Sequence, residues 1–519
     1  MPFPQPTHRL FLALLLLLFL GRIALTWRVF NDTVDESGHI VAGLQYLETG
    51  QYTFEPLHPP LVRLILAVLP HLAGLRFHEN PWAYNGPWVV HDRAFYWKTL
   101  TLARTGNLVF AALLFFFVWR WSILLHGPVA ALAACAILVC CPNILAMAGF
   151  ATLDFAAAVA ILVPAFYFWR WSREPSWRHA LLSGVALGLA ILTKFSSLIL
   201  LPPVILLYFA LARRFPFRQL VVACLLAAVV LWAGYRFDTG SLAPSGHHFR
   251  SKFPNGQQAG FALTLTRSFE HGIIPAPRLF HGLIDLFSYR REGHRAYLLG
   301  RTAQYGWWYY FPVAILLKTT IPLLLLVALS LFAPSPGRLF ALAAIFVVLA
   351  FGMTGNLNLG IRHVLAVYPF FALLAGALFI EPGRLRTVAL ALLTWHAVES
   401  FRAHPDYLPY FNQWARGCEH RYLADSNLDW GQDLARLAQY ARDHGISDLQ
   451  LSYFGLADPA AFGLAARKLN WANPDPGWIA ISVNHMVGID KDPGPATWLW
   501  HLQPRVKIGK SIWLYYFVK

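Results

Sequence analysis

The sequence predicts an all-α polytopic membrane protein with about eleven transmembrane helices, followed by a small α/β extracytoplasmic domain. Two observations predict the membrane part: 57% of the 519 residues are hydrophobic, and only 13% are charged, whereas soluble domains carry roughly 25% charged residues. The third observation is that the chain becomes polar after residue 403. The net charge of +16 does not indicate a nucleic-acid partner, because the basic residues lie in short loops between apolar runs, where they set orientation.

Apolar runs that could cross the bilayer occur along most of the chain, with a spacing that a hydropathy rule can mark. We place spans near residues 10–29, 100–121, 128–149, 153–170, 180–194, 197–212, 218–236, 311–333, 338–355, 364–380 and 386–402. The first is expected to be an uncleaved span, since no small-x-small cleavage site follows it. The run 60–75 is short, so we expect it to lie in the interface or to re-enter.

Basic residues predict which loops are cytoplasmic, because short cytoplasmic loops are enriched in Lys and Arg. Such residues fall in alternate loops, at Arg120, Arg170, Arg173, Arg178, Arg213, Arg214, Arg218, Arg338, Arg384 and Arg386. The outer segments are then 30–99, the turns near Asp154 and Lys194, 237–310, 356–363 and the tail from His404. Function is therefore expected on the outer face.

The polar tail alternates strand-like runs with a helical pattern. The strand-like runs are Leu449–Phe454 and Trp478–Val483, and the helical pattern covers Leu434–Arg442. We therefore divide the chain into a transmembrane domain, 1–403, with outer loops 30–99 and 237–310, and an extracytoplasmic α/β domain, 404–519.

Two short motifs in the first outer loop place polar groups at the membrane boundary. Asp35 and Glu36 follow the first span directly, where carboxylates are costly unless they are used or solvated. Taken alone, they are more often residues that favour the N-terminus of a helix, here over His39–Glu48. The second motif is His58-Pro59-Pro60-Leu61, whose prolines fix an extended backbone before the next apolar segment; alone it would be a turn.

Taken together, these motifs resemble the first lumenal loop of the protein O-mannosyltransferases and of the bacterial aminoarabinose-type lipid A glycosyltransferases. Both belong to the GT-C superfamily of membrane glycosyltransferases, which use lipid-phosphate-linked sugars. Three further segments are similar to the bacterial phospholipid-carrier-dependent branch of family 39: Asn356–His363 with Tyr368-Pro369-Phe370, Gly306–Pro312 with Lys318 and Pro322, and Asp425–Asp433.

The sequence also departs from the eukaryotic mannosyltransferases. Pro56 stands where they carry an acid two residues before His-Pro-Pro, and Arg63 stands where they carry Lys. Their lumenal sugar-binding-like module is absent from this sequence. The resemblance therefore does not imply transfer of mannose to a protein serine.

The resemblance implies roles for residues at the outer face. Asp35 would be the catalytic base with Glu36 beside it, and Asp154 would be a second acid, with a helix N-cap as the equal alternative. Substrate-binding residues would be His58, Arg63, Lys194, Arg301, Lys318, Arg362 and His363. Arg362 is the strongest candidate for the lipid phosphate, because a guanidinium can bind two phosphate oxygens.

Several of these roles leave an alternative open. A divalent metal cation between Asp35 and Asp154 is conceivable, but no ligand spacing demands one. Lys194 and Lys318 could snorkel, although the membrane cost favours a cavity role for Lys318.

Other polar and aromatic groups have two interpretations as well. The basic residues of the long outer loop could steer an anionic carrier or form a solvated face; they are Arg278, His281, Arg290, Arg291, His294 and Arg301. Trp307–Phe311 is expected to be an interface belt rather than a sugar platform. In the tail, Asp425 and Asp429 are expected to cap the helix at Leu434 rather than to bind a metal.

The resemblance implies an inverting glycosyltransferase that moves a hexosyl or pentosyl group from a polyprenyl-phosphate carrier to an acceptor hydroxyl. The acceptor would be a protein, lipid or glycan at the extracytoplasmic side of a bacterial inner or plasma membrane. A secondary transporter or lipid flippase is the alternative, and would place its ionisable residues near the bilayer midplane on broken helices. A catalytically inactive assembly subunit is a third interpretation that the sequence does not exclude.

Overall fold

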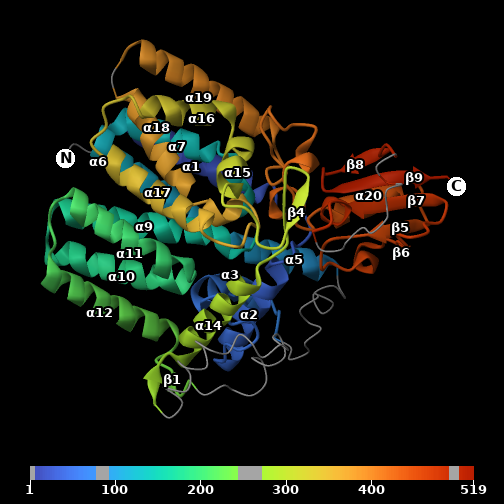
Figure 1. Ribbon diagram of the computed structural model, residues 1–519, viewed down its shortest axis with the longest axis horizontal. Helices are drawn as coiled ribbons and strands as arrows, with labels where there is room; N and C mark the ends of the chain where they lie inside the picture. Colours follow the sequence, from blue (N-terminus) through green and yellow to red (C-terminus); the bar gives the residue numbers. More distant parts are fainter. Residues whose placement is uncertain are drawn as a thin grey trace.

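The structure is a computed structural model that describes residues 6–77, 93–242, 272–380, 382–489, 499 and 502–518. A large bundle of helices forms most of the molecule, and the polar tail forms a separate sheet at one end of it (Figure 1). In Figure 1 the tail lies at the right, while the N-terminus and one set of interhelical turns lie at the left.

The described helices of the first half of the chain are α1 Pro6–Ala24, α2 Glu36–Thr49, α3 Pro60–Leu72, α5 Arg93–Thr105, α6 Asn107–His126, α7 Pro128–Val139, α8 Pro142–Ala148, α9 Leu153–Arg173, α10 Trp177–Thr193, α11 Ser196–Leu211 and α12 Phe217–Gly234. They are followed by α14 Pro277–Glu292, α15 Tyr310–Lys318, α16 Ile321–Ser330, α17 Arg338–Met353, the 3-10 turn η2 Ile361–Val364, α18 Val367–Gly376 and α19 Arg384–Arg402. Two short antiparallel strand pairs flank α14: β1 Thr239–Gly240 with β2 Ile274–Pro275, and the hairpin of β3 Ala296–Leu298 with β4 Arg301–Ala303.

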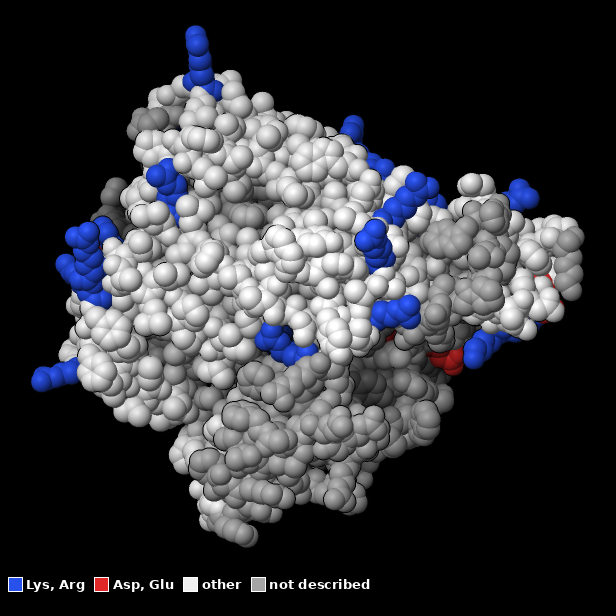
Figure 2. Space-filling model, in the orientation of Figure 1, with Lys and Arg blue, Asp and Glu red and all other residues white. Residues whose placement is uncertain are grey.

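Each predicted apolar run contains a helix or a bent pair of helices. Within the described ranges, four helices are long and apolar enough to cross a membrane, or up to six if each bent pair is one span. The four are Thr7–Ala24, Ala94–His126, Leu153–Arg173 and Phe217–Gly234. The number of eleven spans therefore stays a prediction. Figure 2 shows a wide area of the helical part with few charged side chains, as expected of a surface in contact with lipid.

Two helix pairs are sharply bent, α7 with α8 by 63° and α15 with α16 by 112°. A bend leaves backbone carbonyls without helical partners, and polar side chains from distant segments satisfy them. Asn143 of α8 donates to the carbonyl of Lys318 at 2.9 Å, and Asn412 donates to that of Thr319 at 2.8 Å. The two bends are thus held together at the end of the bundle that faces the tail.

Small residues allow helices α10 and α12 to pack closely against each other. Gly184 and Gly188 lie one turn apart on α10, and a Cβ at either position would fall 2.6 Å and 2.8 Å from the carbonyl oxygens of Ala223 and Ala227 on α12. Glycine at this spacing lets helix backbones approach in a membrane. This packing fixes the helix that ends just before Lys194.

The tail contains a mixed sheet, the helix α20 Leu434–Asp443 and the short helix α21 Val483–Met486. Its strands are β5 Leu449–Ser452, β6 Ala466–Lys468, β7 Gly477–Ser482, β8 Val506–Ile508 and β9 Ile512–Phe517, in the order β6-β5-β7-β9-β8. Leu449 pairs with Trp478 in the parallel centre, and Gly477 pairs with Phe517 in the antiparallel half. The predicted strand-like runs thus correspond to β5 and β7, and the predicted helical pattern to α20.

Candidate active site

A cavity of about 350 Å³ opens at the end of the bundle that carries the first outer loop and the turn η2. Its polar lining comes from segments far apart in the sequence, namely Asp35, His39, Glu55, His58, Asp154, Lys194, Tyr289, Arg290, Arg362 and His363. Apolar groups such as Phe195 and Phe311 complete the wall. Six of the ten residues for which we predicted a catalytic or binding role therefore meet in one place.

Arg362 links the two acids of this cavity. Its Nη1 donates to Asp35 Oδ2 at 2.6 Å and to Asp154 Oδ2 at 3.1 Å. Lys194 Nζ lies 2.5 Å from the other oxygen of Asp154. Burial alone would lower the pKa of Arg362, but the carboxylates of Asp35 and Asp154 hold it above its usual value. The result is a chain of alternating charges along the cavity wall.

Both acids lie at helix starts, yet neither caps its helix through its side chain. Asp35 occupies the N-cap position of α2, and Asp154 lies in the first turn of α9, where Thr152 is the N-cap; no side-chain cap hydrogen bond forms at either end. The carboxylates bind Arg362 and Lys194 instead. The helix-capping alternative for these two acids is therefore not observed.

His58 and Arg63 have different places in the second motif. Pro59 is the N-cap of α3 with an extended backbone, and this places His58 at the cavity. Burial, with the charge of Lys194 nearby, lowers the pKa of His58 to about 3, so its imidazole is neutral near pH 7. Arg63 is fully buried outside the cavity lining, and it pairs with Glu55 and donates to Tyr52 Oη at 2.7 Å. In this structure Arg63 holds the 52–58 loop, and its predicted contact with substrate stays a prediction.

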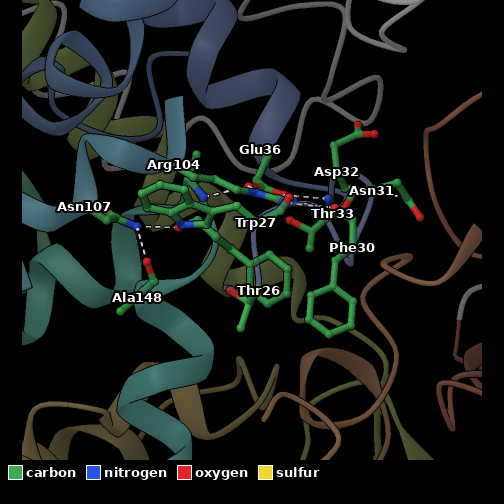
Figure 3. Close-up of polar contacts among 12 residues, drawn as sticks. Thr26, Trp27, Phe30, Asn31, Asp32, Thr33, Glu36, Arg104, Asn107 and Ala148 are labelled. Atoms are coloured by element: carbon green, nitrogen blue, oxygen red, sulfur yellow. Dashed lines mark hydrogen bonds and ion pairs between the residues drawn. The ribbon is translucent and has the colours of Figure 1, made fainter. Parts of the chain in front are cut away.

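Glu36 does not share the cavity with Asp35. Its carboxylate binds Arg104 through Nε and Nη2, both at 2.8 Å, and also accepts the amides of Thr33 and Ala151. Figure 3 shows Arg104 reaching Glu36 inside a polar cluster formed by the segment after α1. Both side chains are fully buried. The carboxylate oxygens of Glu36 are therefore occupied by partners outside the cavity lining, and its predicted catalytic role stays a prediction.

Lys318 and Arg301 also lie away from the cavity lining. Lys318 is buried at the end of α15, where its Nζ donates to the carbonyls of Leu408 and Asn427, both at 2.6 Å. The free-energy cost of burying this charge is thus offset by hydrogen bonds to carbonyls of the tail rather than by a substrate. Arg301 is exposed on the hairpin strand β4. Neither residue lines the cavity, and a substrate contact of either one stays a prediction.

Further polar residues line the cavity without having been predicted as site residues, among them His39, Glu55, Tyr289 and Arg290. Arg290 of α14 lies over the ring of Phe351, 4.7 Å from its centroid, and burial lowers its pKa. The sequence places Arg290 in the basic outer loop, but nothing in the sequence distinguishes it from the other basic residues of that loop. Glu55 stands one residue before the position at which the family pattern carries its acid.

The residues present do not form a ready metal site. Across the described parts of the chain, no group of three or more His, Cys, Asp or Glu side chains is placed to hold a metal ion. The space between Asp35 and Asp154 is crossed by the guanidinium of Arg362. A divalent cation shared by the two acids would have to displace this group, so we derive no step through a metal.

The tail aspartates do not cap α20 as expected. Asp429 accepts the amides of Gly431 at 3.1 Å and Asn484 at 3.2 Å. Asp433 holds the N-cap position without a side-chain cap bond. Burial raises the pKa of Asp429 to about 8 and that of Asp433 to about 6. The partners of both carboxyls lie within the tail itself, at Gly431, Asn484, Ser511 and Arg436.

The chain is similar to known proteins in one segment of its sequence and in its overall fold. A family model described as dolichyl-phosphate-mannose-protein mannosyltransferase matches residues 97–234. Among solved structures, ArnT from Cupriavidus metallidurans bound to undecaprenyl phosphate is similar at TM-score 0.52 and 14% identity, with 97% of each chain covered. Its apo state gives TM-score 0.52, 13% identity and the same coverage.

No curated protein matches the chain by sequence. The predicted resemblance is nevertheless confirmed, because the mannosyltransferase family model matches one segment and nearly the whole chain shares the fold of ArnT.

Proposed function

We propose that this protein is an inverting glycosyltransferase that moves one sugar from a polyprenyl-phosphate carrier to an acceptor hydroxyl. The observation that carries the proposal is the contact of Arg362 with both Asp35 and Asp154 at the cavity wall. An acid that can take a proton and a cation that can hold a phosphate are thereby placed within one cavity. The related ArnT structure is bound to undecaprenyl phosphate, and this supports the class of donor.

The proposed reaction is a single displacement. The acceptor oxygen attacks the anomeric carbon, its proton passes to the Asp35 carboxylate, and the bond from the anomeric carbon to the phosphate oxygen breaks. The bonding electrons leave with the lipid phosphate. Attack from the face opposite the leaving group inverts the anomeric configuration, since no covalent enzyme intermediate forms.

Unused donors in the cavity suit a phosphate ligand. Among the described residues, Arg362 Nε and His58 Nδ1 are buried without a hydrogen-bond partner, and such groups are uncommon in folded proteins. A phosphate oxygen could accept from Arg362 Nε, and from His58 Nδ1 in the tautomer that protonates this nitrogen, while Lys194 and Arg290 add positive charge to the same cavity. The growing charge on the leaving phosphate would then be stabilised as the sugar bond breaks.

The position of the acids favours an enzyme over a transporter or flippase. Asp35 and Asp154 lie at the starts of α2 and α9, at the end of the bundle. A transporter would place its ionisable groups on broken helices near the midplane. Lys318 does lie at such a break, but its ammonium is bound to carbonyls of the tail.

The proposed setting is a bacterial inner or plasma membrane with the cavity at the extracytoplasmic side. The turns with Asp154, Lys194 and Arg362 all reach one cavity, whereas Arg173 and Arg214 belong to turns expected on the other side. Reporters fused after Arg214 should read cytoplasmic, and reporters fused after His404 should read external. An external signal at Arg214 would contradict this orientation.

The function is tested by following the carrier. Purified protein is incubated with undecaprenyl-phosphate-linked sugars, and release of undecaprenyl phosphate is measured with and without a membrane extract as acceptor. Mass spectrometry of a deletion strain should show one lipid-linked sugar accumulating, which also identifies the sugar. Accumulation of no such lipid, together with ion- or lipid-coupled transport in vesicles, would overturn the proposal in favour of a transporter.

A further inference from the structure

The turn that carries Arg362 is held by the tail. Asn427 Oδ1 accepts the amide of Ile361 at 3.0 Å, and the hydroxyl of Ser426 donates to the carbonyl of Leu359. Gly360 precedes the turn with φ +133°, and a Cβ there would collide with Ser426 Oγ. The backbone of the turn is thus fitted to the tail segment on both sides of Gly360.

The same tail segment holds the loop that carries Asp35. The amide of Val34 donates to the carbonyl of Trp430 at 3.1 Å, and Asn31 Nδ2 donates to the carbonyl of Gly431 at 2.8 Å. The amide of Ala435 donates back to Asn31 Oδ1 at 3.1 Å. The segment Ser426–Gly431 therefore joins the two parts of the bundle that supply the acid and the guanidinium.

Trp430 is the residue of this segment that touches both parts. Its indole lies under Arg362, with Cζ 4.4 Å from the ring centroid, and its edge meets the ring of Phe150 at 6.1 Å. Only 2% of Trp430 is exposed. A cation over an indole face is attracted by the ring, most strongly where water is excluded. The ring also limits where the guanidinium can move when Asp35 or a ligand pulls on it.

We infer that Trp430 is a positioning residue of the active site: the extramembrane tail fixes Arg362 against the indole and fixes the Asp35 loop through the carbonyl of the same residue. The assignment of Arg362 to a lipid phosphate rests on the proposed function, whereas the contacts of Trp430 do not. The tail would then be a component of the site rather than a separate acceptor-binding module.

The inference is tested with Trp430→Leu, Trp430→Phe and the control Trp414→Leu. Trp414 is also in the tail but is 56% exposed and lines no part of the cavity. Trp430→Leu should raise the KM for an undecaprenyl-phosphate-linked sugar about tenfold, the scale of a buried cation–π contact, with a smaller change in kcat. Trp430→Phe should retain part of the affinity because it keeps an aromatic face, and Trp414→Leu should leave KM unchanged.

A double-mutant cycle decides whether Trp430 acts through Arg362. In an Arg362→Gln background, Trp430→Leu should change the donor KM by less than about twofold, because the contact is already absent. Equal effects in both backgrounds, or an unchanged KM in Trp430→Leu, would overturn the inference. If Trp430→Leu does not accumulate, the same cycle is measured with Trp430→Phe.

The same cycle is measured on the thermal unfolding of the four purified proteins without any ligand. Coupling between the two substitutions in Tm is expected, and additive shifts would overturn the contact itself. If Arg362→Gln leaves donor KM unchanged while the Tm coupling is present, the proposed function fails in its assignment of the phosphate contact, but Trp430 still positions Arg362. The two failures are thus distinguishable.

Discussion

Asp35 and Glu36 are neighbours in the sequence, and each carboxylate binds an arginine, but the two pairs have different surroundings. The side chains of Glu36 and Arg104 are 0% exposed. Those of Asp35 and Arg362 are 31% and 10% exposed, toward the cavity. The sealed pair can hold the fold together, whereas the open pair can exchange its partners for a substrate.

The hydrogen bonds of the two arginines show the same contrast. Besides Glu36, Arg104 donates to the carbonyls of Phe30 at 2.8 Å and Asn31 at 3.0 Å. Arg362 keeps Nε without a partner among the described residues. A buried donor without a partner costs free energy, and a ligand that accepts from it would recover that cost. The two pairs therefore differ in their hydrogen bonds: Arg104 of the sealed pair has several protein acceptors, whereas Arg362 of the open pair keeps one donor without an acceptor.

The largest effect is expected from breaking the sealed pair. Arg104→Met leaves Glu36 buried without its cation, and such a loss costs about 3–5 kcal/mol of folding free energy. Protein yield and Tm in detergent should both fall sharply. The double variant Arg104→Met with Glu36→Leu should recover part of the stability, because no buried charge remains. A stable Arg104→Met that loses only turnover would instead place this pair in the mechanism.

Removing the charge of Arg362 from the open pair should weaken binding of the donor rather than destabilise the fold. Arg362→Gln keeps hydrogen-bond donors but removes the charge, and loss of a charge-assisted phosphate contact costs roughly 1.5–3 kcal/mol. The KM for the lipid-phosphate donor should therefore rise by about ten- to a hundredfold while yield stays near wild type. An unchanged donor KM would make Arg362 an ordinary structural cation, similar to Arg104.

A smaller effect concerns pH. The pKa of His58 is about 3 in the folded protein and about 6.5 when unfolded, so the unfolded chain binds more protons between these values. The contribution of His58 to stability is therefore lost as pH falls, by up to about 2 kcal/mol at pH 5. Tm measured from pH 7.5 to 5 should fall less steeply in His58→Gln than in wild type. Equal slopes would show that His58 titrates normally.

The smallest effect is expected at a residue outside both pairs. Arg301 was predicted to bind substrate, but it is exposed on β4 and does not line the cavity. Arg301→Ala should change donor KM by less than twofold and stability by less than about 0.5 kcal/mol. A tenfold rise in KM would show that the ligand extends beyond the cavity to the hairpin.

The sequence predicted the class of fold because long apolar runs require a bilayer, and alternate loops place Asp154, Lys194 and Arg362 at one end. It could not separate Asp35 from Glu36, since adjacent residues at a helix start point in different directions and the pattern does not say which one faces a cavity. That assignment depends on Arg104, which lies 68 residues after Glu36 in the sequence.

The position of Lys318 shows a second limit. The cost of a charge inside an apolar run correctly indicated that this lysine needs a partner. Its partners are two backbone carbonyls of the tail, which lie 90 and 109 residues later in the sequence. Backbone carbonyls cannot be recognised from the types of side chain in a sequence. The sequence therefore suggested that Lys318 binds a ligand, whereas in the structure it binds the backbone of the tail.

The most direct test of the central claim compares the neighbouring acids. Asp35→Asn keeps the size of the side chain and removes the proton acceptor, and Asn serves about as well as Asp at an N-cap. Sugar transfer from the lipid-phosphate donor by the purified variant should fall about a hundredfold or more, the usual scale for a general base, with Tm and donor binding near wild type. Glu36→Gln should lower Tm instead and spare the turnover of the folded fraction. Asp35→Asn with near wild-type turnover would contradict the claim that the open pair is the catalytic site.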